Sequence, residues 1–156
     1  MFCFQCEQTA GCGGCTGNAG VCGKKAETAH FQDKLTGALI GLAHATVGNE
    51  YMINDGTHAL IREALFATVT NVGFSDAAIG EMLDRVAVEK ARITPGCSAC
   101  ASPCGRTRDY DMNDLWQADA DIRSLKSLIL FGIRGMAAYA QHAAALGYTD
   151  AAVDGF

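Results

Sequence analysis

The first 22 residues of the chain contain five of its eight cysteines and little from which a helix or a strand could be built. Six glycines lie between positions 11 and 23, and no apolar residues recur there with a helical or a strand period. Cys3 and Cys6 are separated by two residues, so one tight turn presents both thiolates to a single metal. The segment also holds Cys12, Cys15 and Cys22. We therefore predict that a metal centre, rather than side-chain packing, orders the N-terminus.

Three kinds of cysteine site remain open from the residues alone. Four thiolates from a short glycine-rich loop are the usual ligands of an iron–sulfur cluster, and glycine lets backbone N–H groups approach the sulfur atoms. Structural zinc usually takes two separated C-x2-4-C pairs, whereas here one pair is followed by single cysteines. Disulfides need an oxidising compartment, but residues 1–20 lack the basic start and apolar core of a signal peptide. The pattern favours an iron–sulfur protein of the cytoplasm.

The order of residues in this segment resembles the N-terminus of the hybrid cluster proteins, also called hydroxylamine reductases or prismane proteins. MFCFQCEQTA and the later VCGKKAETAHFQDKL carry the resemblance, which returns over residues 121–150. It implies that the cluster ligands are Cys3, Cys6, Cys15 and Cys22, with Cys12 additional. It also implies a helical N-terminal domain that passes electrons to a hybrid iron–sulfur–oxygen cluster in later domains. The ligands of that hybrid cluster have no counterpart in this chain, so we assign it no catalytic residue.

Cysteine spacing bears on the type of cluster. Eight residues lie between Cys6 and Cys15, and six lie between Cys15 and Cys22. The resembled family has one form with a shorter final spacing and a four-iron cluster. Another form has a longer preceding gap and is able to hold a two-iron cluster. Because this chain combines features of both, we expect a [4Fe-4S] cluster and keep [2Fe-2S] as the alternative.

Charge and hydropathy exclude two classes of partner. The net charge is −5 with only 12 lysines and arginines, whereas phosphate binding needs a concentrated basic surface, so we expect no nucleic-acid partner. No apolar run reaches the roughly 18 residues of a membrane-spanning helix, so we expect no membrane contact. A chain of 156 residues that is 49% hydrophobic is long enough for one domain with one sizeable core.

Residues 25–92 carry the apolar pattern of three helices, which predicts an all-α fold built on a three-helix bundle. The first helix is expected from about residue 26 to a stop at Gly48–Asn49. The second is expected from about residue 55 to a break at 71–74. The third is expected from residue 76 to about 90, with Ser75 as its N-cap.

The first helix also carries a stripe of small residues. Gly37, Gly41 and Ala45 recur at every fourth position, so they share one face of the helix. Without bulky side chains on this face, another helix could approach closely. We therefore expect a helix to pack there.

Residues 93–120 contain a second cysteine segment with Cys97, Cys100 and Cys104. The spacing resembles part of a ferredoxin ligand run, but three cysteines are one ligand short of a closed site. Cys12, an Asp or a His would have to supply the fourth ligand. The competing interpretations are a loop of reduced thiols and a disulfide formed during handling. We carry these three cysteines as a secondary metal-site prediction.

An acidic stretch, residues 109–121, closes this segment. It lacks the glycine and the terminal glutamate of a calcium-binding hand. We expect it to be a solvated loop that Leu115 and Trp116 hold to the core.

Residues 121–156 resemble the start of a second helical unit. The last long helix is expected over about 121–145, and its Gly135-Met136-Ala137 matches Gly41-Leu42-Ala43 of the first helix. Its apolar face would need a cover. We therefore expect residues 1–156 to form a single helical domain, the N-terminal part of a larger protein. The cover would be the remaining hybrid-cluster domains or a completing subunit.

Three functions follow as hypotheses. The first is an electron-transfer domain of a hydroxylamine or nitric oxide reductase, which takes electrons from a ferredoxin-like or flavin donor in an anaerobe. The second is a zinc-bound or metal-free interaction module. The third is an iron–sulfur redox sensor. A brown, oxygen-sensitive protein with a reducible cluster separates the first from the second.

Overall fold

The structure, a computed structural model of the chain, describes residues 3–6, 8, 11, 13–69, 73–94 and 108–155. Over these ranges every regular element is a helix, so the predicted all-α fold class is confirmed. No helix within the same ranges has the length and apolar character needed to cross a membrane. The elements in chain order are α1 (Ala26–Thr46), the 3-10 helix η2 (Glu50–Met52), α2 (Asp55–Ala67), α3 (Asp76–Ile93), α4 (Met112–Trp116), α5 (Ala120–Ala145) and α6 (Ala151–Asp154).

Local signals in the sequence set the helix ends. Ser75 caps α3 as predicted, because its hydroxyl accepts a hydrogen bond from the Ala78 N–H at 3.3 Å. Asn54 and Thr57 form a reciprocal capping box at the start of α2. After α1 the chain turns at Gly48, whose φ of +81° suits a residue without a side chain. The predicted positions of the three helices are thus confirmed, and only the last turn of α3 extends beyond its expected end.

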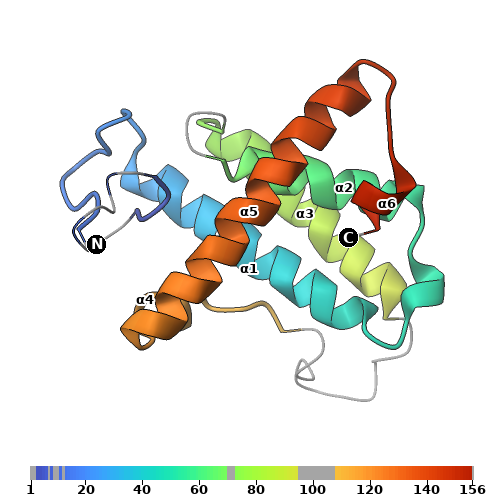
Figure 1. Cartoon of the computed structure of the whole chain (residues 1–156). Coiled ribbons are helices and arrows are strands. Elements are labelled where there is room, and N and C mark those ends of the chain that lie inside the picture. Colours follow the sequence, from blue (N-terminus) through green and yellow to red (C-terminus); the bar gives the residue numbers. More distant parts are fainter. Residues whose placement is uncertain are drawn as a thin grey trace.

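Helices α1, α2 and α3 enclose the main hydrophobic core (Figure 1). The predicted apolar faces meet there, and α1 supplies the central row of side chains. A buried leucine, isoleucine or valine side chain stabilises the fold by about 1.5–3 kcal/mol. The larger buried apolar side chains of this core are Leu35, Leu39, Leu42, Leu60, Ile79, Val86 and Ile93.

The small-residue face of α1 receives a different partner from the one predicted. The irregular segment at residues 108–110 lies on Gly37 and Gly41, whereas Ala45 packs in the core of the three helices. The Tyr110 N–H donates to the Gly37 carbonyl at 3.1 Å. A side chain at Gly37 would place its Cβ 2.1 Å from the Tyr110 carbonyl oxygen. At Gly41 the Cβ would lie 2.7 Å from the Asp109 carboxylate. Glycine is required because polar backbone approaches the helix, which helical periodicity could not reveal.

Helix α5 crosses the three-helix unit and contacts mainly α2 (Figure 1). The only α5 residues that are fully buried in the described structure are Arg134 and Ala137. The apolar face that the sequence predicted for this helix is mostly exposed, with Leu128 70% and Tyr139 83% accessible. Its inward face is therefore short and partly polar, and its outward face is apolar.

Replacing the two kinds of helical glycine by alanine should have opposite effects. Gly37→Ala should lower the free energy of unfolding by about 1–3 kcal/mol, because the new methyl group overlaps the Tyr110 carbonyl. Gly135→Ala should raise it by about 0.5–1 kcal/mol, because nothing lies within 4 Å and alanine favours the helix. Urea unfolding followed by circular dichroism measures both values. An equal gain from both substitutions would contradict the packing of residues 108–110 on α1.

Candidate metal centre

Two short backbone contacts fold the cysteine loop. The Cys15 N–H donates to the Cys3 carbonyl at 3.1 Å, and the two residues form an isolated antiparallel bridge. A second bridge pairs Ala19 with Lys25, and the Gly20 N–H donates to the Lys24 carbonyl at 2.6 Å. The loop therefore doubles back twice before α1 begins, so cysteines distant in sequence come close together.

The sulfur atoms of Cys15 and Cys22 face one small volume beside Gly20. A Cβ at Gly20 would lie 3.4 Å from the Cys22 sulfur and 3.7 Å from the Cys15 sulfur. Cys3, Cys15 and Cys22 carry free thiols. Within the described ranges, no three His, Cys, Asp or Glu side chains have the geometry to enclose a metal ion. The loop brings the sulfur atoms of Cys15 and Cys22 to Gly20, and the chemistry of these soft sulfur donors fits an iron–sulfur cluster or zinc.

The other predicted sulfur ligands lie outside the described residues. Cys12 is one of them, so its predicted status as an additional cysteine stays a prediction. Cys97, Cys100 and Cys104 also lie outside them, and with them the secondary metal-site prediction.

Lys24 is a buried charged side chain between the cysteine loop and α1. It is 1% exposed, and its ammonium donates to the Gln5 Oε1 at 3.0 Å and to the Gln32 Oε1 at 2.5 Å. Burial lowers the pKa of Lys24, while negative charge at Cys3, Cys22 and Cys6 raises it. The ammonium therefore lies within electrostatic range of three of the four predicted ligands.

Cys3 is the one buried cysteine among the four. Burial raises the pKa of its thiol, while a hydrogen bond from the Gln5 backbone and the charge of Lys24 lower it. A backbone N–H aimed at sulfur and a nearby cation both stabilise a thiolate. The surroundings of Cys3 thus contain the groups that a metal-binding thiolate needs.

Gln32 joins the loop to the helical unit. Its Oε1 accepts the hydrogen bond from Lys24, and its Nε2 donates to the carbonyls of Ala67 at 3.2 Å and Gly73 at 2.9 Å. One fully buried amide therefore connects the cysteine loop, α1 and the segment after α2. A buried polar group is tolerated when its donors and acceptors are satisfied in this way.

Arg134 extends the polar network to α5. Its guanidinium donates to the Thr68 hydroxyl at 2.9 Å and to the Thr36 hydroxyl at 2.8 Å, and Thr36 in turn donates to the Gln32 carbonyl at 2.9 Å. Burial lowers the pKa of Arg134, whereas the negative charges of Asp33 and Cys3 raise it. The side chain is 6% exposed, so this cation lies in the interior behind the loop.

Sequence reasoning missed these polar residues. Gln32 lies three positions before Leu35 and seven before Leu39, on the buried stripe of α1. Arg134 likewise lies three positions before the buried Ala137 on α5. The sequence did carry a signal for them: each is a polar residue at a position of the helix that the apolar period assigns to the core.

Asp33 provides a negative charge next to this network. Burial raises its pKa to about 6, while a hydrogen bond with the Trp116 side chain and the charges of Arg134 and Lys24 act in the opposite direction. Trp116 also stacks on Phe4 with ring centroids 4.7 Å apart. Leu115 is 1% exposed, so the predicted anchoring by Leu115 and Trp116 is confirmed. The expected loop around them, however, contains the short helix α4.

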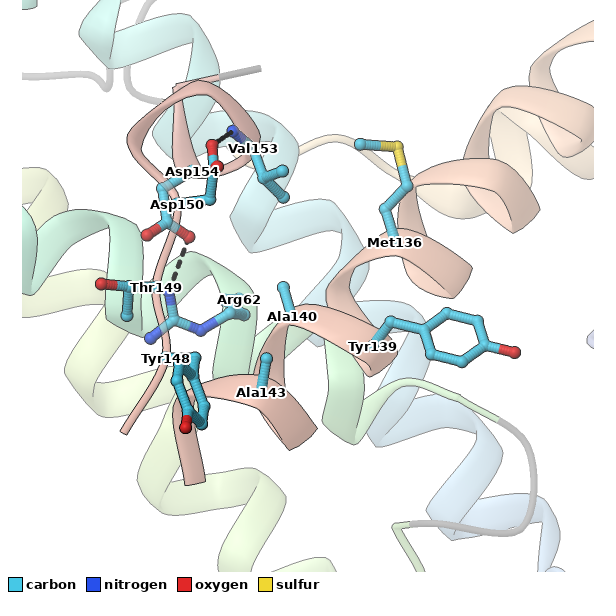
Figure 2. A pocket seen from close by; sticks show the side chains of 10 residues that line it. All are labelled: Arg62, Met136, Tyr139, Ala140, Ala143, Tyr148, Thr149, Asp150, Val153 and Asp154. Atoms are coloured by element: carbon cyan, nitrogen blue, oxygen red, sulfur yellow. Dashed lines mark hydrogen bonds and ion pairs between the residues drawn. The ribbon is translucent and has the colours of Figure 1, made fainter. Parts of the chain in front are cut away.

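Two surface pockets lie elsewhere, and no cysteine lines either of them. A polar one of about 480 Å³ lies between α1 and residues 109–113, with Asp33 among its lining residues. An apolar one of about 430 Å³ lies between α5, α6 and α2 (Figure 2). In the second pocket, Arg62 is paired with Asp154 at 2.6 Å and hydrogen-bonded to Gln141 at 3.3 Å. The charges in this pocket are therefore already engaged, and the pocket mainly extends the apolar surface of α5.

Comparison with known proteins identifies the family. Residues 1–156 match the family model described as the Prismane/CO dehydrogenase family. A hydroxylamine reductase of Methanocella arvoryzae is 39% identical over 96% of this chain and 32% of its own length. One of Chlorobaculum tepidum is 41% identical over 96% of this chain and 30% of its own length. One of Porphyromonas gingivalis is 37% identical over 100% of this chain and 32% of its own length.

The chain therefore belongs to the Prismane/CO dehydrogenase family, as its N-terminal motif led us to expect. Membership implies an iron–sulfur cofactor in general. The chain spans about a third of the length of the curated relatives that it matches.

Substituting the predicted ligands singly should separate them from Cys12. Cys3→Ser, Cys6→Ser, Cys15→Ser or Cys22→Ser should each lower the iron content several-fold and expose the loop to protease, because metal binding and loop folding are coupled. Cys12→Ser is the matched control and should keep the wild-type iron content. Iron analysis and limited proteolysis of anaerobically purified variants measure both effects. Full iron in Cys15→Ser with loss in Cys12→Ser would overturn the assignment.

Asp33 should make stability depend on pH. Because its pKa is about 6 in the folded chain and 3.8 in its usual state, the folded state holds a proton that the unfolded chain has released between these values. The free energy of unfolding therefore falls as pH rises through this window. Relative to wild type, Asp33→Asn should gain about 1–3 kcal/mol between pH 4 and 7 in denaturant unfolding. A constant difference would contradict the burial of a charged Asp33.

Proposed function

We propose that this chain is the electron-relay domain of a hydroxylamine or nitric oxide reductase of the hybrid cluster type. In this proposal Cys3, Cys6, Cys15 and Cys22 hold one [4Fe-4S] cluster. The observation that carries the proposal is the folding of the loop, which brings the Cys15 and Cys22 sulfur atoms to the same side of Gly20 and pairs the backbone of Cys3 with that of Cys15. The reductase names of the relatives support the reaction class.

A cluster with four thiolate ligands supplies one-electron chemistry and leaves no open position for a substrate. The residues around the ligands stabilise the charge of the thiolates and shield the loop. The Gln5 backbone N–H stabilises negative charge at Cys3, and Lys24 adds a buried positive charge on the helical side of the loop. Phe4, stacked on Trp116, covers the start of the loop with aromatic surface. These residues fix the ligands and limit the access of water, while catalysis is left to other domains.

The exposure of the loop supports electron entry from outside. Cys22 is exposed, whereas Cys6 and Cys15 are half-buried. An electron donor that docks on the loop therefore comes close to the ligands without any rearrangement of the helices. A ferredoxin-like or flavin protein is the donor class that we propose. The reducing cytoplasm suits such a centre, because thiols remain reduced there.

The exposed face of α5 supports a second contact. The chain covers about a third of the length of its relatives, so the rest of each relative is about twice as long as the matching region. We propose that this remaining part of the reductase, on the same polypeptide or as a separate subunit, covers the apolar face of α5. The main exposed residues of this face are Leu125, Leu128, Ile129, Met136 and Tyr139. The pocket with Arg62 continues the face toward α6.

Metal and sulfide analysis with electron paramagnetic resonance tests the proposal. Anaerobically purified protein should contain about four iron and four sulfide per chain, the composition of a [4Fe-4S] cluster, and should show a signal after reduction with dithionite. Two of each would change the cluster to [2Fe-2S] and keep the relay. Zinc without sulfide would overturn electron transfer and leave the structural module. Clearly more than four iron would revive the site at Cys97, Cys100 and Cys104.

A further inference from the structure

Helix α5 has an exposed apolar stripe along its outward side. Its members recur at spacings of three or four residues, so they lie on one side of the helix. Leu128 and Tyr139 are 70% and 83% exposed, and nothing lies within 4 Å of a Cβ placed at either of the two glycines between them. The outward stripe consists of Leu125, Leu128, Gly132, Gly135, Met136 and Tyr139.

Helix α1 shows how a matching position is filled. Gly135-Met136-Ala137 of α5 corresponds to Gly41-Leu42-Ala43 of α1. On α1 another segment of the chain lies against the glycine, because a Cβ there would come 2.7 Å from the Asp109 carboxylate. The leucine that follows is 0% exposed, whereas the matching methionine of α5 is 41% exposed. The position is thus occupied on α1 and open on α5.

The chemistry of the stripe indicates the kind of partner. The lysine and arginine side chains of α5 all contact other parts of the chain: Arg123 donates to the Trp116 carbonyl at 3.1 Å, and the Lys126 ammonium lies 5.5 Å from the centre of the Tyr110 ring. The third, Arg134, is buried. The stripe itself is therefore apolar, which is typical of a permanent interface and not of a transient contact with an electron donor.

We propose that a helix from the remaining part of the reductase packs along the outward stripe and crosses α5 at Gly132 and Gly135. This inference rests on the proposed function only in that the rest of a reductase accompanies the chain. In the relatives, that rest is about twice as long as the matching region. Spacings of three and four residues fit a second helix, and glycine at the crossing lets the two helix axes approach closely.

The pocket between α5 and α6 extends this docking surface. Met136 and Tyr139 belong to the stripe and also line the pocket, together with Ala140 and Ala143 of the same helix (Figure 2). Its volume of about 430 Å³ is large enough for an apolar side chain. The docked helix therefore places such a side chain there, next to Arg62, whose charge is already paired with Asp154.

The test is hydroxyl-radical footprinting of the isolated chain and of two fusions. Each fusion joins residues 1–156 to the part of a relative that follows the matching region, taken from the Methanocella arvoryzae or the Chlorobaculum tepidum hydroxylamine reductase. Modification of Tyr139 should fall several-fold in the fusions. Tyr51 of η2 is the matched control: it is 80% exposed, lies outside the stripe and should react equally in all three proteins.

A pair of glycine variants tests the crossing point. Nothing lies within 4 Å of a Cβ at Gly135 on α5 or at Gly80 on α3, so Gly135→Leu and Gly80→Leu should both leave the isolated chain folded. In the fusions, Gly135→Leu should return the modification of Tyr139 to the level of the isolated chain, because the new side chain separates the helices. Gly80→Leu should keep the protection.

Each outcome decides one question. Loss of protection in Gly135→Leu alone supports the inference. Unchanged reactivity of Tyr139 in both fusions overturns it, and so does protection that survives Gly135→Leu. Protection of Tyr139 in an isolated chain that light scattering shows to be a dimer would make a second copy the occupant and would overturn it as well. Iron and sulfide analysis of the same fusions tests the relay separately, since the footprint needs no bound metal.

Discussion

The hydrogen bond from the Lys24 ammonium to the Gln32 Oε1 connects the N-terminal cysteine loop to the helical unit. The cysteine loop contributes little apolar surface of its own, since Cys3 is its one buried hydrophobic residue within the described ranges. An ammonium in the interior without acceptors would cost several kcal/mol, so the position of Gln32 is constrained. Gln32 is held in turn by two backbone carbonyls beyond α1. The loop is thus attached to the helices through these polar contacts together with the stacking of Phe4 on Trp116.

This attachment explains why the helical unit contains a buried polar network next to its hydrophobic core. The leucines of α1 build the core with α2 and α3, while Gln32 and Thr36 face the network that includes Arg134. Helix α5 therefore contributes a cation to the inside and apolar residues to the outside. A helix that is apolar on its outward face is typical of one that is buried on both sides, which is what the proposed contact with the rest of the reductase provides. The same helix thereby links the charge behind the loop to the proposed contact with the rest of the reductase.

Much of the helical scaffold could be predicted from the sequence, because periodic apolar residues and caps act locally. Ser75 was found in this way, and so was the start of α2. The segment that packs on Gly37 could not be predicted, since the stripe of small residues shows only that something approaches and not what it is. Lys24 and Arg134 were missed for a related reason. Whether a charged side chain is buried depends on distant partners such as Thr68, which no local pattern reveals.

The most direct test of the account is the reactivity of the cysteines in the metal-loaded protein. Iodoacetamide labelling under anaerobic conditions, followed by peptide mass spectrometry, should leave Cys3, Cys6, Cys15 and Cys22 unlabelled until the metal is removed. Cys22 is the decisive residue, because it is exposed and only a bond to the metal would protect it. Immediate labelling of Cys22, or protection of Cys97, Cys100 and Cys104 in its place, would contradict the assignment of the centre to the N-terminal loop.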